Sequence, residues 1–271
     1  MTEISVMVLA MLGTGIVGGI LAGLLGVGGG IVIVPVLETV LGLLGVPVEI
    51  RMHVAVATSL AVIIPTSISS ARAHHSRQSV DFDLVKRWAP FILFGAITGI
   101  IIASHVNGVV LSAVFGVVAL LVAVKMALPL DDVTLSSAVP RGIGTGIIPA
   151  CVGTISTMMG IGGGTLSVPA LTLMSTPIHR AVGTSALFGL LISIPGAVGF
   201  AISGWGNELL PAGSVGFVNL IGFAVIAPAT VIAAPLGAKL AHALSRRNLS
   251  LLFGLFLLLV SARMIYRAIQ G

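Results

Sequence analysis

Two glycine-rich blocks are the strongest candidates for a binding site in this sequence. Residues 26–30 read Gly-Val-Gly-Gly-Gly, and residues 160–164 read Gly-Ile-Gly-Gly-Gly. Each glycine costs a helix about 1 kcal/mol relative to alanine, so three in a row should interrupt one. Free N–H groups and a helix N-terminus at such an interruption favour an anion. The alternative is that the glycines only let helices cross closely. The predicted anion ligands are Gly28, Gly29, Gly30, Gly162, Gly163 and Gly164.

Two Thr-Ser pairs follow the glycine blocks at matching places. Thr58 and Ser59 follow the first block, and Thr184 and Ser185 follow the second. Their hydroxyls can donate hydrogen bonds to anionic oxygens. Serine and threonine also bond to the backbone of their own helix in membranes, which is the alternative. Because the pair is repeated, we include all four residues in the predicted substrate site.

Two histidines lie five residues before the two threonines. His53 and His179 occupy equivalent positions, and Arg51 and Arg180 lie beside them. A cation near an anion site could attract substrate or carry a coupled proton. The alternative is that these four side chains cap segment ends at the membrane interface. We include them in the predicted substrate site as its source of positive charge.

Glu38 is an acidic residue within an apolar segment. Intramembrane acids are candidates for function by default, here for coupling to an ion. The alternative is a place near water, because the segment is short and Glu49 is close. Thr172 stands at the matching position after the second block, so a coupling role for Glu38 would be asymmetric.

The composition is that of an integral membrane protein. Of 271 residues 57% are hydrophobic and 8% are charged, against about 25% charged in an average soluble domain. This excludes a soluble enzyme, a nucleic-acid-binding protein and a disordered chain. One cysteine, Cys151, excludes an internal disulfide framework and is expected to be a small core residue. No metal ligand set and no cofactor motif is predicted.

The membrane segments are expected to be helices. A crossing needs about 20 apolar residues, and the continuous apolar runs do not alternate as the strands of an outer-membrane barrel would. Glycines and prolines divide the long runs. We predict an all-α protein with about 8–10 transmembrane segments, some short or broken. The segments are 4–25, 31–45, 54–71, 88–106, 108–128, 141–159, 164–175, 181–202, 213–240 and 248–269.

Three blocks in the first half of the chain recur in the same order in the second half. Residues 26–37 match 160–171 at an offset of 134, residues 53–59 match 179–185 at 126, and residues 111–126 match 249–264 at 138. Three matches in the same order rarely arise by chance. We predict two membrane repeats, residues 1–130 and 141–271, joined by a polar linker at residues 131–140.

The basic residues predict that the two repeats are inverted. Residues 72–87 and 239–248 carry lysines and arginines, whereas their counterparts 203–213 and 104–108 carry none. The positive-inside rule places the basic loops in the cytoplasm and the counterparts outside. Arg263 and Arg267 then fall outside, where they either snorkel to the interface or show that the count of crossings is wrong by one. His74 and His75, in the first basic loop, are expected to be solvated.

Signatures of other chemistry are missing or misleading. Residues 13–18 read Gly-Thr-Gly-Ile-Val-Gly, which fits a dinucleotide fingerprint, but that motif needs a preceding strand. Here it lies in an apolar helix, so we expect it to serve close helix packing. The sequence has no serine-hydrolase elbow, zinc-protease motif or ATP-binding P-loop.

The paired glycine blocks, each with a proline five residues on, and the paired Thr-Ser motifs resemble the TauE/SafE family of sulfite and organosulfonate exporters. The resemblance covers nearly the whole chain. It implies a secondary transporter of small sulfur-containing anions such as sulfite or sulfoacetate, without fixing the direction. The first half departs from the second by Ala57 in place of Gly183 and by extra residues at about 42–50, which puts exact symmetry of the two halves in doubt.

Together these features predict a multi-pass transporter in a bacterial inner membrane, with an anion site where the two glycine blocks meet. Such proteins bind at the interface of their repeats and expose the site alternately to either side. Coupling to protons or sodium, and the oligomeric state, are left open. The alternatives are a passive anion channel, a transporter of non-sulfur carboxylates, an intramembrane enzyme using His53 and His179, and a structural protein.

Overall fold

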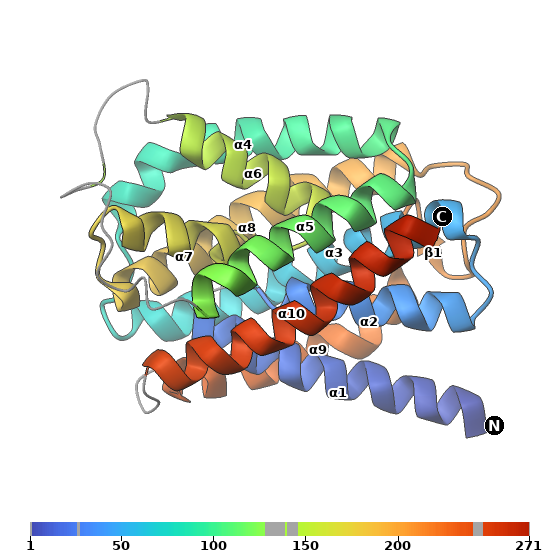
Figure 1. Ribbon diagram of the computed structural model, residues 1–271, viewed down its shortest axis with the longest axis horizontal. Helices are drawn as coiled ribbons and strands as arrows, with labels where there is room; N and C mark the ends of the chain where they lie inside the picture. The colour runs from blue at the N-terminus through green and yellow to red at the C-terminus, as the bar shows by residue number, and fades with distance from the viewer. Residues whose placement is uncertain (1, 26–27, 128–138, 140–145, 241–245, 271) are drawn as a thin grey trace.

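The chain forms an all-α membrane protein, as predicted. The computed structural model describes residues 2–25, 28–127, 139, 146–240 and 246–270 (Figure 1). Within these ranges there are ten helices and one short β-hairpin. The helices are α1 (Thr2–Leu25), α2 (Gly30–Leu43), α3 (Val48–His75), α4 (Phe82–His105), α5 (Gly108–Ala127), α6 (Ile147–Met159), α7 (Gly164–Leu173), α8 (Ile178–Ser203), α9 (Leu220–Leu240) and α10 (Arg246–Gln270), and the strands are β1 (Ser214–Val215) and β2 (Val218–Asn219).

The ten helices are not ten crossings. Helices α2, α6 and α7 contain 14, 13 and 10 residues, and at about 1.5 Å per residue each is shorter than a hydrocarbon core of about 30 Å. Among the described residues, α3, α4, α5, α8 and α9 are long and apolar enough to cross a membrane. Figure 1 shows α2 in the right half of the molecule and α7 in the left half, with both termini on the right.

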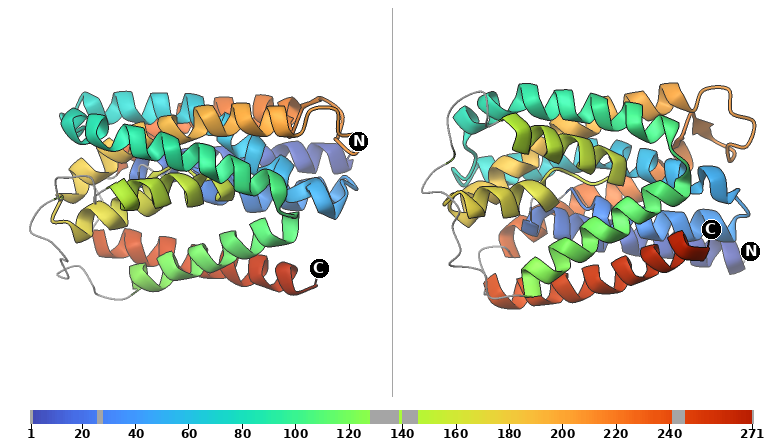
Figure 2. Two further views of the ribbon diagram at one scale, coloured as in Figure 1. Left: turned by 90° about the horizontal axis from the view of Figure 1, so that it is seen from above. Right: turned by 45° about the horizontal axis from the view of Figure 1, so that its top comes forward.

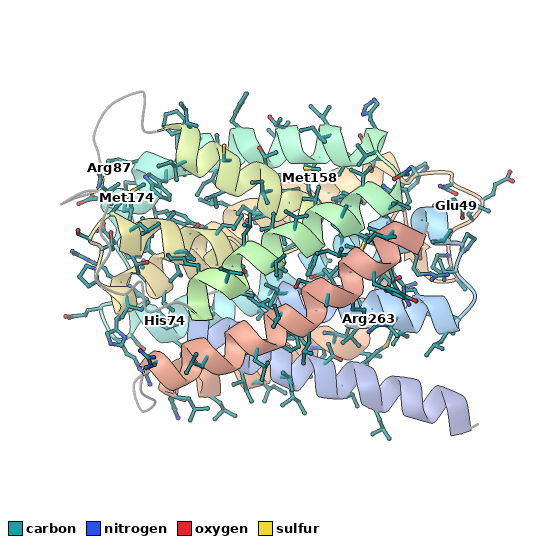
Figure 3. All side chains as sticks on the ribbon, viewed as in Figure 1. Glu49, His74, Arg87, Met158, Met174 and Arg263 are labelled. Atoms are coloured by element: carbon teal, nitrogen blue, oxygen red, sulfur yellow. The ribbon has the colours of Figure 1, made fainter. Side chains whose placement is uncertain are left out.

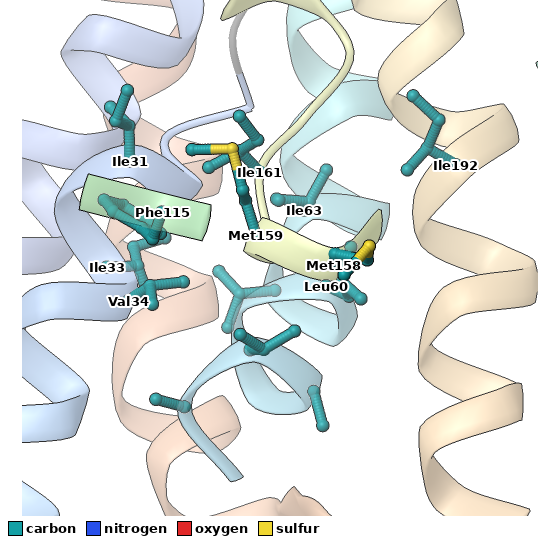
Figure 4. Packing of buried hydrophobic residues seen from close by; sticks show 14 of the residues in the cluster. Ile31, Ile33, Val34, Leu60, Ile63, Phe115, Met158, Met159, Ile161 and Ile192 are labelled. Carbon is teal, nitrogen blue, oxygen red and sulfur yellow. The ribbon is translucent and has the colours of Figure 1, made fainter. Parts of the chain in front are cut away.

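Helices α3 and α8 form the centre of the molecule. Within the most apolar 18-residue stretch of α3, 78% of the residues are buried. The helix packs against α2, α5, α8 and α9. Helices α4 and α7 pack against α8, and Figure 2 shows the long helices lying side by side. The buried apolar side chains nearest to it include Ile63 of α3, Ile31 and Ile33 of α2, and Met159 of α6 (Figure 4).

Glycines let the outer helices approach the centre closely. A Cβ atom added at Gly15 of α1 would lie 2.7 Å from the Cβ of Ala229 on α9, and one added at Gly19 would lie 2.6 Å from the carbonyl oxygen of Thr230. The helix that holds the misleading dinucleotide motif therefore uses its glycines for packing, as predicted. Helices α4 and α6 meet in the same manner, since a Cβ added at Gly99 would lie 2.5 Å from the carbonyl oxygen of Thr154.

Two smaller predictions are wrong. Cys151 is exposed, because α6 turns its Gly153 face toward Ile92 of α4 and leaves Cys151 on another face. His74 is not solvated but buried, and its Nε2 lies 2.9 Å from the carbonyl oxygen of Gly23. That contact satisfies a carbonyl near the end of α1 that has no partner within the helix. The predicted linker at residues 131–140 lies outside the described residues, apart from Val139.

Candidate functional site

The two glycine-rich breaks meet inside the molecule. Gly28 and Gly29 have φ angles of 73° and 76°, and Gly160 has a φ of 66°, so each break contains left-handed backbone that glycine adopts without strain. A Cβ added at Gly28 would lie 3.2 Å from the Cα of Gly162. The breaks from the two halves of the chain are therefore in direct backbone contact, and isoleucines of α2, α3 and the second break surround the meeting point (Figure 4).

One face of α3 runs along both breaks. Ser59, Ile63 and Ser67 are spaced four residues apart, which places them on the same side of the helix. The Ser59 hydroxyl donates to the carbonyl oxygen of Gly160 at 2.7 Å. The Ile63 side chain lies 2.9 Å from a Cβ added at Gly28.

Ser67 continues this face toward α8. Its Oγ lies 2.6 Å from a Cβ added at Gly189, and that Cβ would be 3.9 Å from the Cα of Gly162. Ser185 stands one turn before Gly189, so it lies on the same face of α8. Helix α3 thus brings Ser59 and Ser67 to the second break, and α8 adds Ser185 on the face that carries Gly189.

Buried hydroxyls without a partner lie on α3, on α8 and on the two helices that flank the second break. Among the described residues, six buried serine and threonine hydroxyls have no hydrogen-bond partner, and each residue is at most 2% exposed. An unsatisfied buried polar group costs about 1–3 kcal/mol, so such groups are rare in native proteins and indicate a function or a bound molecule. The six residues are Ser67, Ser156, Thr157, Thr165, Ser167 and Ser185.

Four of these hydroxyls flank the second break itself. Ser156 and Thr157 are in the last turn of α6, and Thr165 and Ser167 are in the first turn of α7. The N–H groups of Thr165 and Ser167 already donate to the carbonyl oxygens of Gly162 and Gly163, whereas their hydroxyls have no partner. A helix N-terminus also carries partial positive charge. The hydroxyls and the helix N-terminus at the start of α7 therefore suit an oxyanion.

The two predicted threonines bind helix ends instead of facing the breaks. The Thr58 hydroxyl oxygen accepts the N–H of Asn219 at 2.9 Å, and Asn219 Oδ1 in turn accepts the N–H of Gly222 at the start of α9. The Thr184 hydroxyl oxygen accepts the N–H of Asp81 at 3.0 Å. Asp81 likewise caps α4. Each threonine therefore holds a capped helix start from the other half of the chain.

Comparison with known proteins places this arrangement in a family. The model of the sulfite exporter TauE/SafE family matches residues 11–264. The chain belongs to the TauE/SafE family. It is 35% identical over 259 residues to a probable membrane transporter protein of Haemophilus influenzae, an alignment that covers 95% of this chain and 97% of the relative.

Two more distant relatives carry the same kind of description. A probable membrane transporter protein of Methanocaldococcus jannaschii, MJ0441, is 28% identical, with 90% of this chain and 93% of the relative covered. The probable membrane transporter protein YunE of Bacillus subtilis is also 28% identical, with 94% and 96% covered. No solved structure matches the chain. The chain is thus a multi-pass membrane transporter of the TauE/SafE family.

The four predicted basic residues of this TauE/SafE chain lie at two ends of the molecule, away from the breaks. Helix α3 begins near Glu49 on the right of Figure 3, and α8 begins just after Met174 on the left. His53 Nε2 lies 3.1 Å from the carbonyl oxygens of Ala103 and Val106, and its ring stacks on Phe217.

The two predicted arginines are held by contacts near their own helix ends. The guanidinium of Arg51 donates to the carbonyl oxygen of Val46 at 2.8 Å and 3.1 Å. Arg180 lies 3.6 Å from Asp81 and is largely exposed. His179 is exposed as well. The described structure therefore brings the glycines and Ser59 of the predicted site together. Ser185 lies one turn before Gly189 on α8, and the four basic residues lie outside this group.

Five of the hydroxyl residues in this TauE/SafE chain were missed by the sequence analysis. Ser156, Thr157, Thr165 and Ser167 have no hydroxyl counterpart in the first half at the offset of 134 residues. Ser67 has a counterpart, Ser193, at the offset of 126, but both lie beyond the repeated Thr-Ser motif. The signal that could have found them is their position, since four of the five lie within four residues of the glycines of the second block. Hydroxyl side chains next to a broken membrane helix are therefore candidates for a binding site even where they do not belong to a repeated motif.

Proposed function

We propose that the chain is a secondary transporter of small sulfur-containing anions: sulfite, thiosulfate or organosulfonates such as sulfoacetate. The observation that carries the proposal is the meeting of the two breaks beside six buried hydroxyls that have no partner. The description of the matching family model, a sulfite exporter, supports the choice of sulfur anions.

The proposed site binds the anion with neutral donors. The backbone around residues 28–30 and 162–164 supplies N–H groups, and Thr165, Ser167, Ser67 and Ser185 supply hydroxyls. A sulfite or sulfonate group has three oxygens, each of which accepts such bonds. Helices α2 and α7 both begin at the breaks, so their dipoles add partial positive charge at the same place.

The two threonine contacts suit gates for alternating access. Asn219, held by Thr58, lines a cavity of about 480 Å³ near the end of α2. Asp81, held by Thr184, lines a cavity of about 580 Å³ near the start of α8. We infer that the chain consists of two inverted repeats, since Asp81 and Asn219 match at the offset of 138 residues. Opening one contact at a time would expose the site first to one side and then to the other.

Three other functions predict different results. A passive anion channel would show flux without coupling to a proton or sodium gradient and without saturation. A transporter of non-sulfur carboxylates would move lactate in preference to sulfite. An intramembrane enzyme that uses His53 and His179 is disfavoured, because these residues lie near opposite ends and cannot act on one bond.

The test is flux in proteoliposomes. Sulfite, thiosulfate, sulfoacetate and lactate are compared, each with and without a pH gradient and a sodium gradient. We expect saturable movement of a sulfur anion that depends on one of the gradients. Equal movement of all four anions, linear in concentration and independent of both gradients, would show a channel. The proposed location is the inner membrane of a bacterium.

A further inference from the structure

A second group of charged residues lies away from the breaks, where α2, α3 and α10 come together. Glu38 of α2 is only 4% exposed. Its Oε1 lies 3.8 Å from Nη1 of Arg51 on α3 and in direct contact with Nη1 of Arg267 on α10. One buried carboxylate is therefore shared by two guanidinium groups from different parts of the chain.

This group has an excess of positive charge. One carboxylate neutralises one of the two guanidiniums, and the other Glu38 oxygen, Oε2, is enclosed without a partner. Arg263, one turn before Arg267, donates to the hydroxyl of Thr39 and adds a further positive charge. Other acids at this end include Glu49 in the first turn of α3 and Glu208 in the loop after α8, and both are exposed. The balance favours an anion of one or two negative charges.

The excess charge lines a cavity. Arg51 and Arg267 line a cavity of about 310 Å³ together with Glu38, Ser112 and the small residue Gly108. The Arg51 side chain is fixed by its bonds to the Val46 carbonyl oxygen, so its orientation does not have to be ordered on binding. A guanidinium presents several N–H donors in one plane, which suits the oxygens of an oxyanion.

The rule that basic residues gather in the cytoplasm does not explain these arginines. The charge pattern predicts that the lysine- and arginine-rich loops 72–87 and 239–248 face the cytoplasm, and Arg51, Arg263 and Arg267 lie at the other end of the molecule (Figures 1 and 3). Arg267 does not simply extend toward the interface, because it contacts a buried carboxylate. Its place calls for another explanation.

We propose that Arg51 and Arg267, held by Glu38, form a second oxyanion-binding site at this end of the molecule, separate from the breaks. The bound group has terminal oxygens on sulfur or phosphorus. A free sulfite or sulfate ion and the phosphate of an anionic lipid share this chemistry. A free ion would bind here before it moves to the site at the breaks, whereas a lipid would remain bound here through its headgroup.

The test changes the charge of the cavity in two ways, by adding a carboxylate beside the ionic residues and by removing one guanidinium. Val48 also lines the cavity, is 48% exposed and begins α3. Glutamate is favourable in the first turn of a helix, so Val48→Glu should fold normally while it repels an anion or occupies Arg51. Val48→Gln is the matched neutral control. Arg267→Gln removes one cation, and Arg247→Gln on the same helix is its control at the other end.

Binding is measured by calorimetry on purified protein in neutral detergent, in a Ser67→Ala plus Ser185→Ala background that weakens the site at the breaks. One arm titrates sodium sulfite and sodium sulfate, and the other titrates short-chain phosphatidylglycerol with phosphatidylcholine as its control. We expect Val48→Glu and Arg267→Gln to weaken binding about tenfold or more, a loss of about 1.4 kcal/mol, relative to Val48→Gln and Arg247→Gln.

Each outcome decides between the sources or against the site. A response to sulfite or sulfate supports a free-ion site, and a response to phosphatidylglycerol alone supports a lipid site. If neither arm distinguishes the variants from their controls, Glu38, Arg51 and Arg267 only join three helices and the proposal is wrong. The result does not depend on transport, so it stands apart from the flux test of the site at the breaks.

Discussion

The two breaks have the same backbone plan but different side chains. Both carry the same pattern of glycines, and each is followed by a proline, Pro35 or Pro169, inside the helix that begins there. The first break is followed by Ile31 and Ile33, which are fully buried in the apolar core. The matching positions after the second break are Thr165 and Ser167, whose buried hydroxyls have no partner.

The same difference appears before the breaks. Ser156 and Thr157 precede the second break, whereas Ala22 and Gly23 stand at the matching places before the first. Gly23 serves contact between α1 and α9. The duplicated glycines therefore build the shape of the centre, and the second half supplies most of its polar chemistry. The glycines that the two halves share identify the backbone framework of the centre, and the hydroxyl residues that differ between the halves identify the candidate ligands.

Disturbing the contact between the breaks should have the largest effect. Gly28→Ala places a methyl group 2.9 Å from Ile63 and 3.2 Å from Gly162 at a φ of 73°. We expect flux of sulfite to fall by more than about tenfold and the thermal unfolding temperature in detergent to drop, because left-handed backbone alone costs about 1–2 kcal/mol and the clash adds to it.

The control for this variant is Gly206→Ala. Gly206 has a φ of 77° and nothing within 4 Å of an added Cβ. It should show the cost of the left-handed backbone without the loss of flux. Equal flux in the two variants would mean that close contact of the breaks is not needed for transport.

Removing the hydroxyls of the second break should separate transport from stability. The double variant Thr165→Val plus Ser167→Ala should lose about tenfold or more of its sulfite flux, if each hydroxyl contributes about 1 kcal/mol of binding. Its unfolding temperature should stay the same or rise, because groups that were buried without a partner are gone.

The matched variant in the first break is Ile31→Val plus Ile33→Val. It should behave in the opposite way: each change costs about 0.5–1.5 kcal/mol of stability through lost packing, with flux close to that of the unchanged protein. If both double variants lose flux equally, the difference between the breaks has no functional meaning.

Two serines of α3, Ser67 and Ser59, allow the same comparison between an unpartnered hydroxyl and a structural residue within one helix. Ser67→Ala removes a hydroxyl without a partner, so sulfite flux should fall by about threefold to tenfold without loss of stability. Ser59→Ala removes the bond to Gly160 and should cost about 1 kcal/mol of stability. Both are read from flux and thermal unfolding of the same preparations. A fall in stability for Ser67→Ala would contradict its place as a ligand.

Removing the threonine contacts should change the accessibility of the breaks with a modest loss of stability. Thr58→Ala and Thr184→Ala each remove one acceptor of a backbone N–H, worth about 0.5–1.5 kcal/mol. If the contacts are gates, the two variants should shift the accessibility of the breaks in opposite directions, measured by thiol labelling of a Ser185→Cys variant with Cys151→Ser. A shift in the same direction would contradict the gate model.

The sequence predicted the helices well because apolar length and glycine interruptions decide them locally. Each of the ten expected segments contains a helix, although three of these helices are too short to cross a membrane and the segment expected from residue 213 begins with the β-hairpin before α9. The exposure of Cys151 and the burial of His74 could not be predicted, since both depend on which face of a helix meets its neighbour. Hydrophobicity all around a membrane helix conceals that face.

The site was predicted in part for a similar reason. The glycines of the two blocks meet as expected, because repeated breaks in a membrane protein are required to be buried. Thr58 and Thr184 instead accept the N–H groups of Asn219 and Asp81, which cap helices far away in sequence. Thr165 and Ser167 were missed because they occur in one half alone. Only the packing of α3 and α8 against both breaks shows which hydroxyls come together.

The most direct test of the central claim is equilibrium binding of sulfite to the Val48→Glu protein. In this variant the added carboxylate is expected to prevent anion binding at the cavity lined by Arg51 and Arg267. We expect saturable binding of one sulfite per chain that is lost when Thr165→Val and Ser167→Ala are added and retained when Ile31→Val and Ile33→Val are added. Sulfite binding that is unchanged by the loss of both hydroxyls would contradict the claim that the second break holds the anion.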